Sequence, residues 1–429
     1  MKLLIRGGKV VDPANGINDG RDVAIIDGKL AGLNGISDLS DFQVIDATGK
    51  IVCPGFIDMH VHLREPGFEY KEDIVAGTRA AAAGGITTVC CMPNTEPVID
   101  NAAVASFVVD RARKAGLVNV LPIGAITKKQ EGNELSEIGE LVSAGCVAVS
   151  DDGKPVMKAD IMRNALDYTK MFGLPVLSHC EDLALAADGQ MHEGYYSTIY
   201  GLKGIPTAAE EVMAARDIIL ARLTGGHVHI CHISTRGSVE LIRQAKKDGI
   251  KVTCEATPHH LTLTDELVGS YDADTKVNPP LRSTEHVEAL LEGLNDGTID
   301  CIVTDHAPHH LESKDCEYNL AAFGISGLET SVAVCMNLVN QGKLSLEKMV
   351  SLYTTGPANV LGIDKGTLTP GMAADVTIID PEKVKIVDPA EFYSRGKNSA
   401  FKGMKLKGWP VTTIVAGNVV TENGRIVTP

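Results

Sequence analysis

Residues 56–67 read Phe56-Ile57-Asp58-Met59-His60-Val61-His62-Leu63-Arg64-Glu65-Pro66-Gly67, an apolar run that ends in two histidines one residue apart. Side chains of a strand alternate with a period of two, so His60 and His62 point to the same face of the predicted strand. Their Cα atoms would lie roughly 6.6 Å apart, which lets both imidazoles bind one metal ion. Arg64 and a Pro-Gly turn follow directly, which indicates that this strand ends at the edge of a polar site.

The middle of the chain repeats this pattern of an apolar run followed by a helical stretch. Eight such runs occur, over residues 56–62, 85–92, 119–127, 147–152, 175–181, 227–234, 251–258 and 300–306. Helices are predicted between them, for example over residues 71–83, 102–115, 207–223 and 238–247. Alternating strands and helices predict a parallel α/β sheet, and eight units favour a (β/α)8 TIM-type barrel. A doubly wound open sheet stays an alternative, because periodicity does not show whether the sheet closes.

Both ends of the chain have a different pattern, with short β-segments separated by turns. These segments cover residues 3–6, 23–28 and 43–46 near the N-terminus, and 375–380 and 411–420 near the C-terminus. The Asp27-Gly28 pair is typical of a tight hairpin. We therefore expect a small β-sandwich domain formed by both chain termini, with residues 1–53 and 365–429 on either side of a barrel over residues 54–364.

Composition restricts the class of protein. A chain of 429 residues with 44% hydrophobic content can bury one large core and a smaller one. The formal net charge of -15 argues against nucleic acid as a partner. We find neither a signal-like N-terminal segment nor an apolar run of membrane-spanning length, so we expect a soluble, cytoplasmic protein without a membrane partner. Its ten cysteines lack metal-ligand spacing and are expected to be mostly reduced, buried side chains.

Reactive side chains gather at the ends of the predicted strands, where barrel enzymes place their active sites. They are His60, His62, Asp151, Asp152, His179, His232, Asp305 and His306. Four histidines and two carboxylates are enough to hold two metal ions. Each residue alone has a simpler explanation, such as a hydrogen-bonded core histidine or a turn, but their joint occurrence favours a site. The other histidines are expected to be structural or exposed, namely His192, His227, His229, His259, His260, His286 and His310.

Several motifs together resemble one known family. They are residues 56–67, Met92-Pro93-Asn94-Thr95, Ser150-Asp151-Asp152-Gly153, His179-Cys180-Glu181-Asp182, Asn278-Pro279-Pro280-Leu281-Arg282 and Asp305-His306-Ala307-Pro308-His309. This combination is similar to that of the bacterial type I dihydroorotases, which are cyclic amidohydrolases of the amidohydrolase superfamily. The resemblance runs over nearly the whole chain.

The resemblance implies a site for two zinc ions with six protein ligands: His60, His62, Asp152, His179, His232 and Asp305. The first two histidines and Asp305 would hold the more buried ion, and His179 and His232 the other. Many relatives bridge the ions with a carboxylated lysine on strand four, but this chain has no lysine there. We therefore expect an aspartate bridge and choose Asp152 over Asp151. Asp305 would also act as the general acid and base.

The resemblance further implies substrate contacts, namely Arg64, Asn94, Asn278, His309 and the backbone of Phe323 and Gly324. Arg64 can bind a carboxylate through two parallel hydrogen bonds. Its simpler explanation is a surface ion pair with Glu65 or Glu69. Residues 310–325 could cover the site or form an ordinary rim loop. Similar enzymes often have proline before the glycine region, where this chain has Ala321-Ala322.

The implied activity is dihydroorotase, which reversibly closes N-carbamoyl-L-aspartate to L-dihydroorotate and water in de novo pyrimidine (UMP) biosynthesis. Two other functions stay open. The chain could be another cyclic amidohydrolase, such as a dihydropyrimidinase or an allantoinase, or a non-catalytic subunit that scaffolds aspartate transcarbamoylase. A homodimer and a complex with aspartate transcarbamoylase are both compatible with the resemblance. Arg64, the absent bridging lysine and the complete ligand set favour the dihydroorotase.

Overall fold

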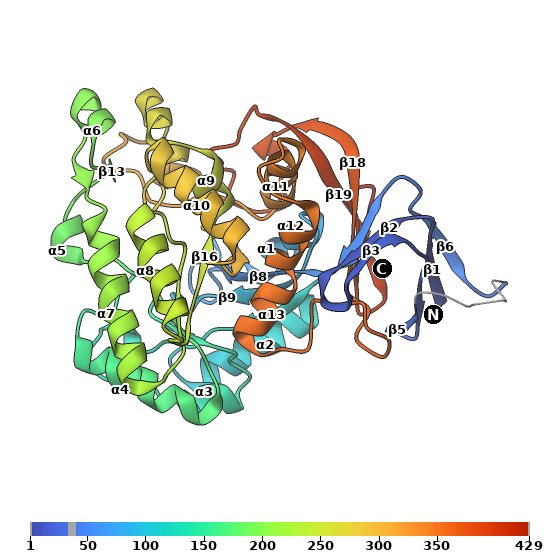
Figure 1. Ribbon diagram of the computed structural model, residues 1–429, viewed down its shortest axis with the longest axis horizontal. Coiled ribbons are helices and arrows are strands. Elements are labelled where there is room, and N and C mark those ends of the chain that lie inside the picture. The colour runs from blue at the N-terminus through green and yellow to red at the C-terminus, as the bar shows by residue number, and fades with distance from the viewer. Residues whose placement is uncertain (1, 33–39, 428–429) are drawn as a thin grey trace.

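The computed structural model describes residues 2–32 and 40–427, and its centre is a barrel of eight parallel strands (Figure 1). These are β8 (Phe56–Val61), β9 (Ile86–Cys91), β10 (Asn119–Pro122), β11 (Val149–Ser150), β12 (Val176–Ser178), β15 (Val228–Ile230), β16 (Val252–Ala256) and β17 (Cys301–Ile302). They pair in two runs, β8 to β10 and β11 to β17. Backbone bridges between Val61 and His306 and between Gly124 and Val149 join the runs at both ends. The closed barrel confirms the predicted fold class and excludes an open sheet.

Every predicted apolar run contains one of these strands, but the strands end earlier than the runs. In the last run, for example, only Cys301 and Ile302 are strand, and the residues after them turn into irregular backbone. Asp305 in this run and His232 in the run over residues 227–234 have positive φ angles of 46° and 30°. Such conformations cost free energy for non-glycine residues and concentrate at functional sites. At the polar ends of these runs the regular strand pairing therefore stops, and the backbone takes conformations that are typical of functional sites.

Helices surround the barrel on its outside (Figure 1). They are α1 (Ile74–Ala83), α2 (Ala102–Ala115), α3 (Ile138–Ser143), α4 (Ala159–Thr169), α7 (Ala208–Thr224), α8 (Arg236–Lys247), α10 (Thr284–Asp296), α11 (Ser331–Asn340), α12 (Leu346–Tyr353) and α13 (Thr355–Leu361). The predicted helix over residues 71–83 begins later because the Asp73 side chain accepts a hydrogen bond from Ala76 N at 2.7 Å and caps α1. Shorter elements above the strand ends are α5 (Leu183–Ala186), β13 (Met191–His192), α6 (Tyr195–Tyr200), β14 (Gly204–Ile205) and α9 (Pro258–Thr262).

Both ends of the chain form two β-sheets beside the barrel (Figure 1). The four-stranded sheet contains β5 (Lys29–Gly32), β4 (Val23–Ile26), β1 (Lys2–Arg6) and β6 (Gln43–Asp46). The seven-stranded sheet contains β21 (Arg425–Ile426), β20 (Asn418–Glu422), β19 (Lys405–Val415), β18 (Val376–Ile386), β7 (Ile51–Pro54), β2 (Lys9–Asp12) and β3 (Ile17–Gly20). β7 pairs with β2 on one side and with β18 on the other, so the two chain ends share a sheet. Ile5, Val52 and Val376 belong to the common apolar core of the two sheets.

Two turns define this β-region. Asp27 and Gly28 have φ angles of 49° and 79°, which suit a type I′ turn, and they join β4 to β5 as the sequence predicts. The run over residues 411–420 was expected to be a single segment, but Ala416 and Gly417 interrupt it with another left-handed pair at 46° and 79°. It therefore forms parts of two strands, β19 and β20. The domain boundaries at residues 53 and 364 stay predictions.

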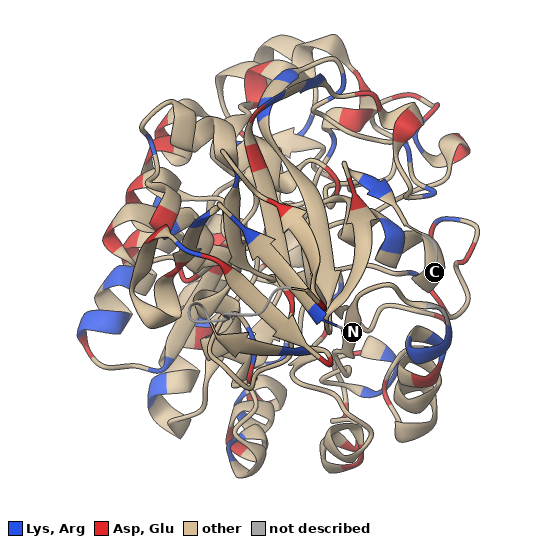
Figure 2. Ribbon diagram, turned by 90° about the vertical axis from the view of Figure 1, so that its right-hand side faces the viewer, with Lys and Arg blue, Asp and Glu red and all other residues tan. Residues whose placement is uncertain are grey.

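All ten cysteines are free, and every one of them except Cys316 is buried, as the sequence predicts. Within residues 2–32 and 40–427, no helix combines the length and the apolar character that a membrane span requires. Figure 2 shows basic and acidic residues intermixed along the helices and strands of the face that carries the chain termini.

Candidate metal and substrate site

One cavity of about 270 Å³ opens at the C-terminal ends of the barrel strands. Its lining includes every predicted metal ligand and substrate contact except His60. His60 lies beneath the floor of the cavity and is fully buried. The barrel thus brings together residues that are up to 264 positions apart in the sequence, from His60 to Gly324.

The first group of predicted ligands comes from β8 and the end of β17. Asp305 Oδ1 lies 3.1 Å from His62 Nε2 and 3.6 Å from His60 Nε2. Asp152 adds its two oxygens, Oδ2 at 3.4 Å from His62 Nε2 and Oδ1 at 3.4 Å from His60 Nε2. Ligands about 2.0–2.1 Å from a tetrahedral zinc ion are about 3.3–3.4 Å apart, so these separations fit such an ion.

The second group surrounds the same aspartate. His179 Nδ1 and His232 Nε2 each lie 3.5 Å from Asp152 Oδ1 and are 3.0 Å from each other. Asp152 therefore stands between the two groups, in the position that a bridging ligand occupies. His60 Nε2 and Asp152 Oδ1 are buried and have no hydrogen-bond partner among the described residues. Two buried polar atoms without partners, a ring nitrogen and a carboxylate oxygen, suit a cation between them.

The carboxylates of this cluster are ionised. Burial raises the pKa of Asp152, but His60, His179 and His232 outweigh it and hold the pKa well below its usual range. For Asp305, burial is likewise outweighed by the hydrogen bond from His62 and by neighbouring histidines, and the pKa falls to about 2. Deprotonated carboxylates are the form that binds metal ions.

Asp151 has a different role from its neighbour. Its carboxylate accepts hydrogen bonds from Ile126 N at 2.8 Å, from Thr127 N at 3.1 Å and from the Thr127 hydroxyl. Burial raises its pKa to about 6. Asp151 thus ties the end of β11 to residues 126–127, whereas Asp152 faces the histidines. This geometry supports the choice of Asp152 as the predicted bridge.

Asp58 fixes the distance between the first and the last strand of the barrel. It accepts hydrogen bonds from Thr304 Oγ1 at 2.6 Å, from Thr304 N at 3.2 Å and from His60 N at 3.2 Å. Burial raises the pKa of Asp58 to about 7. His60 is bonded to Asp58 directly, and Asp305 follows Thr304 in the chain, so Asp58 holds the backbone of both predicted ligands in place.

Arg64 does not form the surface ion pair that is its simpler explanation. Glu65 pairs instead with Arg111 Nε at 2.7 Å, and Glu69 accepts a hydrogen bond from Gly67 N at 2.9 Å. Arg64 lines the cavity, its φ is 61°, and its buried Nε has no partner among the described residues. Burial lowers the pKa of Arg64 to about 10. The site thus offers a cation in position for an anionic ligand.

The two predicted asparagine contacts each support a histidine. Asn94 Oδ1 lies 2.9 Å from His62 Nδ1, which leaves the NH2 group of Asn94 for another partner. Asn278 Nδ2 donates to both oxygens of Glu181, at 3.1 and 3.2 Å. Glu181 in turn lies 3.4 Å from His179 Nε2. The NH2 group of Asn278 is therefore engaged, and its oxygen is the atom left for a substrate.

His309 donates from Nε2 to Phe323 O at 2.9 Å, so its other nitrogen is an acceptor in the neutral ring. That atom, Nδ1, is buried without a partner among the described residues. Burial, together with Arg64 and the nearby lysines, lowers the pKa of His309 to about 2. The predicted contact between His309 and a carboxylate therefore requires a second proton on this ring.

Residues 310–325 are anchored to the barrel by two buried lysines. Lys314 Nζ donates to Ala273 O at 2.9 Å, and Lys276 Nζ lies 4.6 Å from the centre of the Phe323 ring. Gly324 N donates to Lys276 O at 2.9 Å. A side chain at Gly324 is not tolerated, because its φ is 125° and a Cβ would come within 2.8 Å of a backbone oxygen. The loop thus presents Phe323 and Gly324 to the cavity.

Sequence reasoning missed the carboxylates that lie behind the histidines. Glu181 contacts His179, and Glu255 contacts His60 Nδ1 at 2.5 Å. Glu255 could have been found, because a glutamate inside the apolar run 251–258 is unusual. His306, although at a strand end, lies 3.4 Å from Glu72 and is absent from the cavity lining.

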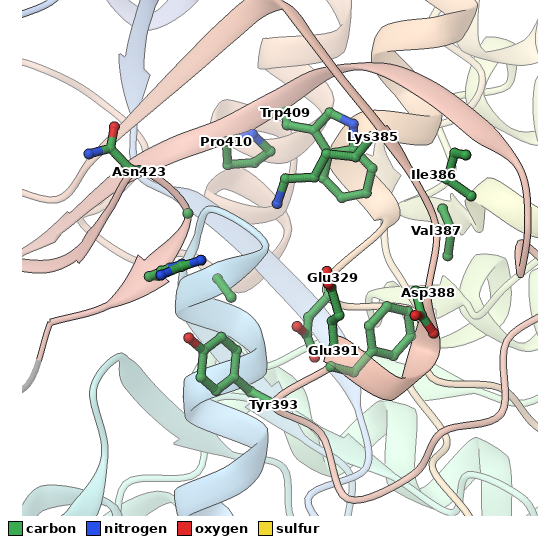
Figure 3. Close-up of a pocket in the computed structure, with 14 residues that line it drawn as sticks. Glu329, Lys385, Ile386, Val387, Asp388, Glu391, Tyr393, Trp409, Pro410 and Asn423 are labelled. Atoms are coloured by element: carbon green, nitrogen blue, oxygen red, sulfur yellow. The ribbon is translucent and has the colours of Figure 1, made fainter.

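A second hollow of about 370 Å³ lies under β18 and β19, away from the strand ends (Figure 3). Figure 3 shows Glu329, Lys385, Tyr393 and Trp409 around it. None of the predicted site residues lines this hollow.

Known proteins resemble this chain over its whole length. The model of the "Dihydro-orotase-like" family matches residues 49–238, and that of the "Amidohydrolase family" matches residues 325–421. A dihydroorotase from Pelotomaculum thermopropionicum is 59% identical over 424 residues, which are 99% of each chain. A dihydroorotase from Citrifermentans bemidjiense is 56% identical and covers 98% of this chain and 99% of its own.

Solved structures share the fold. The L-hydantoinase (dihydropyrimidinase) of Arthrobacter aurescens superposes with a TM-score of 0.90 at 30% identity, over 99% of this chain and 97% of its own. The dihydropyrimidinase of Brevibacillus agri has a TM-score of 0.87 at 24% identity, over 100% of this chain and 96% of its own, which shows the fold alone.

Proposed function

This chain belongs to the dihydroorotase family of amidohydrolases, and we propose that it is a zinc-dependent dihydroorotase. It would interconvert N-carbamoyl-L-aspartate and L-dihydroorotate plus water. Arg64 carries this proposal, because a largely buried guanidinium without a carboxylate partner among the described residues borders the predicted ligand cluster. Such a cation costs free energy unless a ligand pairs with it. Dihydroorotate brings the required carboxylate, whereas dihydrouracil and hydantoin do not.

Family membership implies a metal cofactor, and we propose two zinc ions. One ion would be held by His60, His62 and Asp305. The other would be held by His179 and His232, and Asp152 would bind both ions. Bound zinc would polarise the amide carbonyl and lower the pKa of a water ligand to about 7. The separations between the ligand atoms, and the buried polar atoms without partners among them, support this assignment.

Asp305 would move the proton of the reaction. Its carboxylate is ionised and lines the cavity, so it can take a proton from the attacking water. It can then return that proton to the ring nitrogen as the amide bond breaks. In the direction of cyclisation, the same group would take the proton from the carbamoyl nitrogen.

The substrate carboxylate would lie between Arg64 and the free NH2 group of Asn94. Arg64 can donate two parallel hydrogen bonds to it. His309 could share this carboxylate with a proton on Nδ1. Asn278 would face the pyrimidine ring with its oxygen, and the backbone of residues 323–324 would close the side of the cavity.

Another cyclic amidohydrolase is the second candidate function, because the two solved structures described above are named hydantoinase and dihydropyrimidinase. The decisive experiment combines metal analysis of the purified protein with turnover of dihydroorotate, dihydrouracil and allantoin side by side. Turnover of dihydroorotate alone is the expected result. Turnover of a neutral ring instead would refute the proposal, and two bound metals without any turnover would indicate a scaffolding subunit.

We place the reaction in de novo pyrimidine biosynthesis and the protein in the cytoplasm, where its ten free cysteines would stay reduced. A homodimer and a complex with aspartate transcarbamoylase stay predictions. Sedimentation of the purified chain, alone and with that partner, would test both.

A further inference from the structure

A line of polar side chains crosses the interior of the barrel below the predicted metal cluster. Its four members, which we call the interior polar line, are His227, Thr253, His229 and Glu255. His227 Nε2 lies 2.8 Å from Thr253 Oγ1, which lies 2.8 Å from His229 Nδ1. His229 Nε2 lies 3.1 Å from Glu255 Oε2, and Glu255 Oε1 lies 2.5 Å from His60 Nδ1.

The strand geometry explains why these residues meet. His229 and Thr253 are direct partners in the pairing of β15 with β16, and residues two apart on each strand share a face. His229 therefore points inward on β15, His227 lies directly before that strand at the same spacing, and Thr253 and Glu255 point inward on β16. The remaining interior of the barrel is mostly apolar, with Met59 and other apolar side chains in one cluster.

The interior polar line is costly unless it is fully hydrogen-bonded. Glu255, His229 and His60 are all completely buried. A buried carboxylate without partners costs several kcal/mol. Here Glu255 Oε1 also accepts from His232 N at 3.2 Å, so both oxygens have donors. Apolar side chains would fill this space without such requirements, which indicates that the line serves a purpose at its upper end.

In the form in which all three histidine rings are neutral, the hydrogen-bond pattern assigns every proton of this line. A carboxylate only accepts, so His60 Nδ1 and His229 Nε2 must both donate to Glu255. His229 Nδ1 is then the acceptor of the Thr253 hydroxyl, and that hydroxyl accepts from His227 Nε2. For His60, a proton on Nδ1 leaves the lone pair on Nε2. That atom faces Asp152 Oδ1 at 3.4 Å, where the predicted metal ion would lie.

We propose that Glu255 is a positioning residue that fixes the tautomer and the orientation of His60, and that His229, Thr253 and His227 hold Glu255 in place. The inference rests on the proposed metal site, but not on which cyclic amide is hydrolysed. Outer partners of this kind commonly change metal affinity by about 10- to 100-fold. The role of His229 and His227 is therefore more than the filling of a core.

The test measures the zinc affinity of the metal-free protein by competition with a chelator, together with its unfolding temperature. Glu255→Gln should weaken zinc binding by about 10- to 100-fold. Thr253→Val removes a neutral hydrogen-bonding group further from the metal cluster and should weaken zinc binding by about two- to fivefold. The control is Asp12→Asn, a buried carboxylate of the β-region that accepts from Leu368 N at 2.9 Å. It should lower the unfolding temperature and leave zinc affinity unchanged.

Wild-type zinc affinity in both Glu255→Gln and Thr253→Val would overturn the inference, whatever their stability. If Glu255→Gln does not fold, Thr253→Val decides alone, because valine keeps the shape of threonine. Unchanged zinc affinity with normal dihydroorotate turnover would leave the proposed function intact and refute only the role of Glu255. A wild-type chain that binds no divalent cation would instead refute the metal site and this inference together.

Discussion

Replacing Arg64 by methionine tests which ring the enzyme accepts. The change keeps an unbranched apolar side chain in place of the aliphatic part of arginine and removes the charged guanidinium. In the free protein, Arg64 Nε is buried without a partner among the described residues, and burial lowers the pKa of the group. Loss of this charge should therefore not destabilise the metal-free protein, whereas it should damage the binding of an anionic substrate.

The size of the effect follows from the lost interaction. A hydrogen bond to a charged group contributes about 1.5–3 kcal/mol. At about 1.4 kcal/mol for each factor of ten, Arg64→Met should lower kcat/KM for dihydroorotate by about 10- to 150-fold. Zinc content should stay at the wild-type value, because Arg64 is not a predicted ligand. Dihydrouracil, which lacks the carboxylate, should stay without turnover in the variant, as we expect for the wild type.

The control is Arg243→Met, which breaks an ion pair between helices α8 and α10, where Arg243 Nε lies 2.8 Å from Asp296. It should leave both turnover and zinc content unchanged. Steady-state kinetics with both compounds, metal analysis and thermal unfolding provide the measurements. A kcat/KM for dihydroorotate within twofold of wild type in Arg64→Met would refute the carboxylate assignment, and a loss of zinc would show that Arg64 acts on the metals instead.

Three further predictions concern the cluster and its rim. Asp152→Asn should remove at least one zinc ion per chain in metal analysis, whereas Asp151→Asn should lower the unfolding temperature and keep both ions; the reverse result would exchange their roles. A non-reactive pyrimidine carboxylate should bind with uptake of up to one proton at pH 7, because a protonated His309 in the complex requires its pKa to rise from about 2 to well above 7. The affinity of the protein for this ligand should therefore increase as the pH falls. Calorimetry in buffers of different ionisation enthalpy measures this uptake, and equal heats in all buffers would exclude a protonated His309. Lys276→Met removes the cation beside Phe323 and should raise KM more than it lowers kcat; an unchanged KM would show that residues 310–325 keep their place without it.

Much of the barrel could be predicted because each of its strands corresponds to an apolar run in the sequence, and several of these runs end in reactive residues. His60 and His62 illustrate this, since two histidines at strand spacing must share a face. The positions of His179, His232 and Asp305 follow from the same rule applied to other runs. The structure brings these residues into one cavity, and their roles as ligands stay predictions.

The remaining features depend on contacts that no local pattern encodes. Asp151 and Asp152 are adjacent and chemically identical, and the backbone NH groups of Ile126 and Thr127, with the Thr127 hydroxyl, decide which one turns away from the histidines. Glu255 is placed under His60 by the order of strands around a closed barrel. Closure itself depends on bridges between residues far apart in the chain, which periodicity cannot reveal.

The link between Asp58 and Thr304 has a consequence for how the protein is made. These residues are 246 positions apart, and at about 5–20 residues per second a ribosome needs about 12 to 50 seconds to add them both. During that time His60 and His62 exist on the growing polypeptide without Asp305. The predicted ligand set is thus complete only when the last strand pairs with the first, so we expect metal to bind in full only after residue 305 has been added.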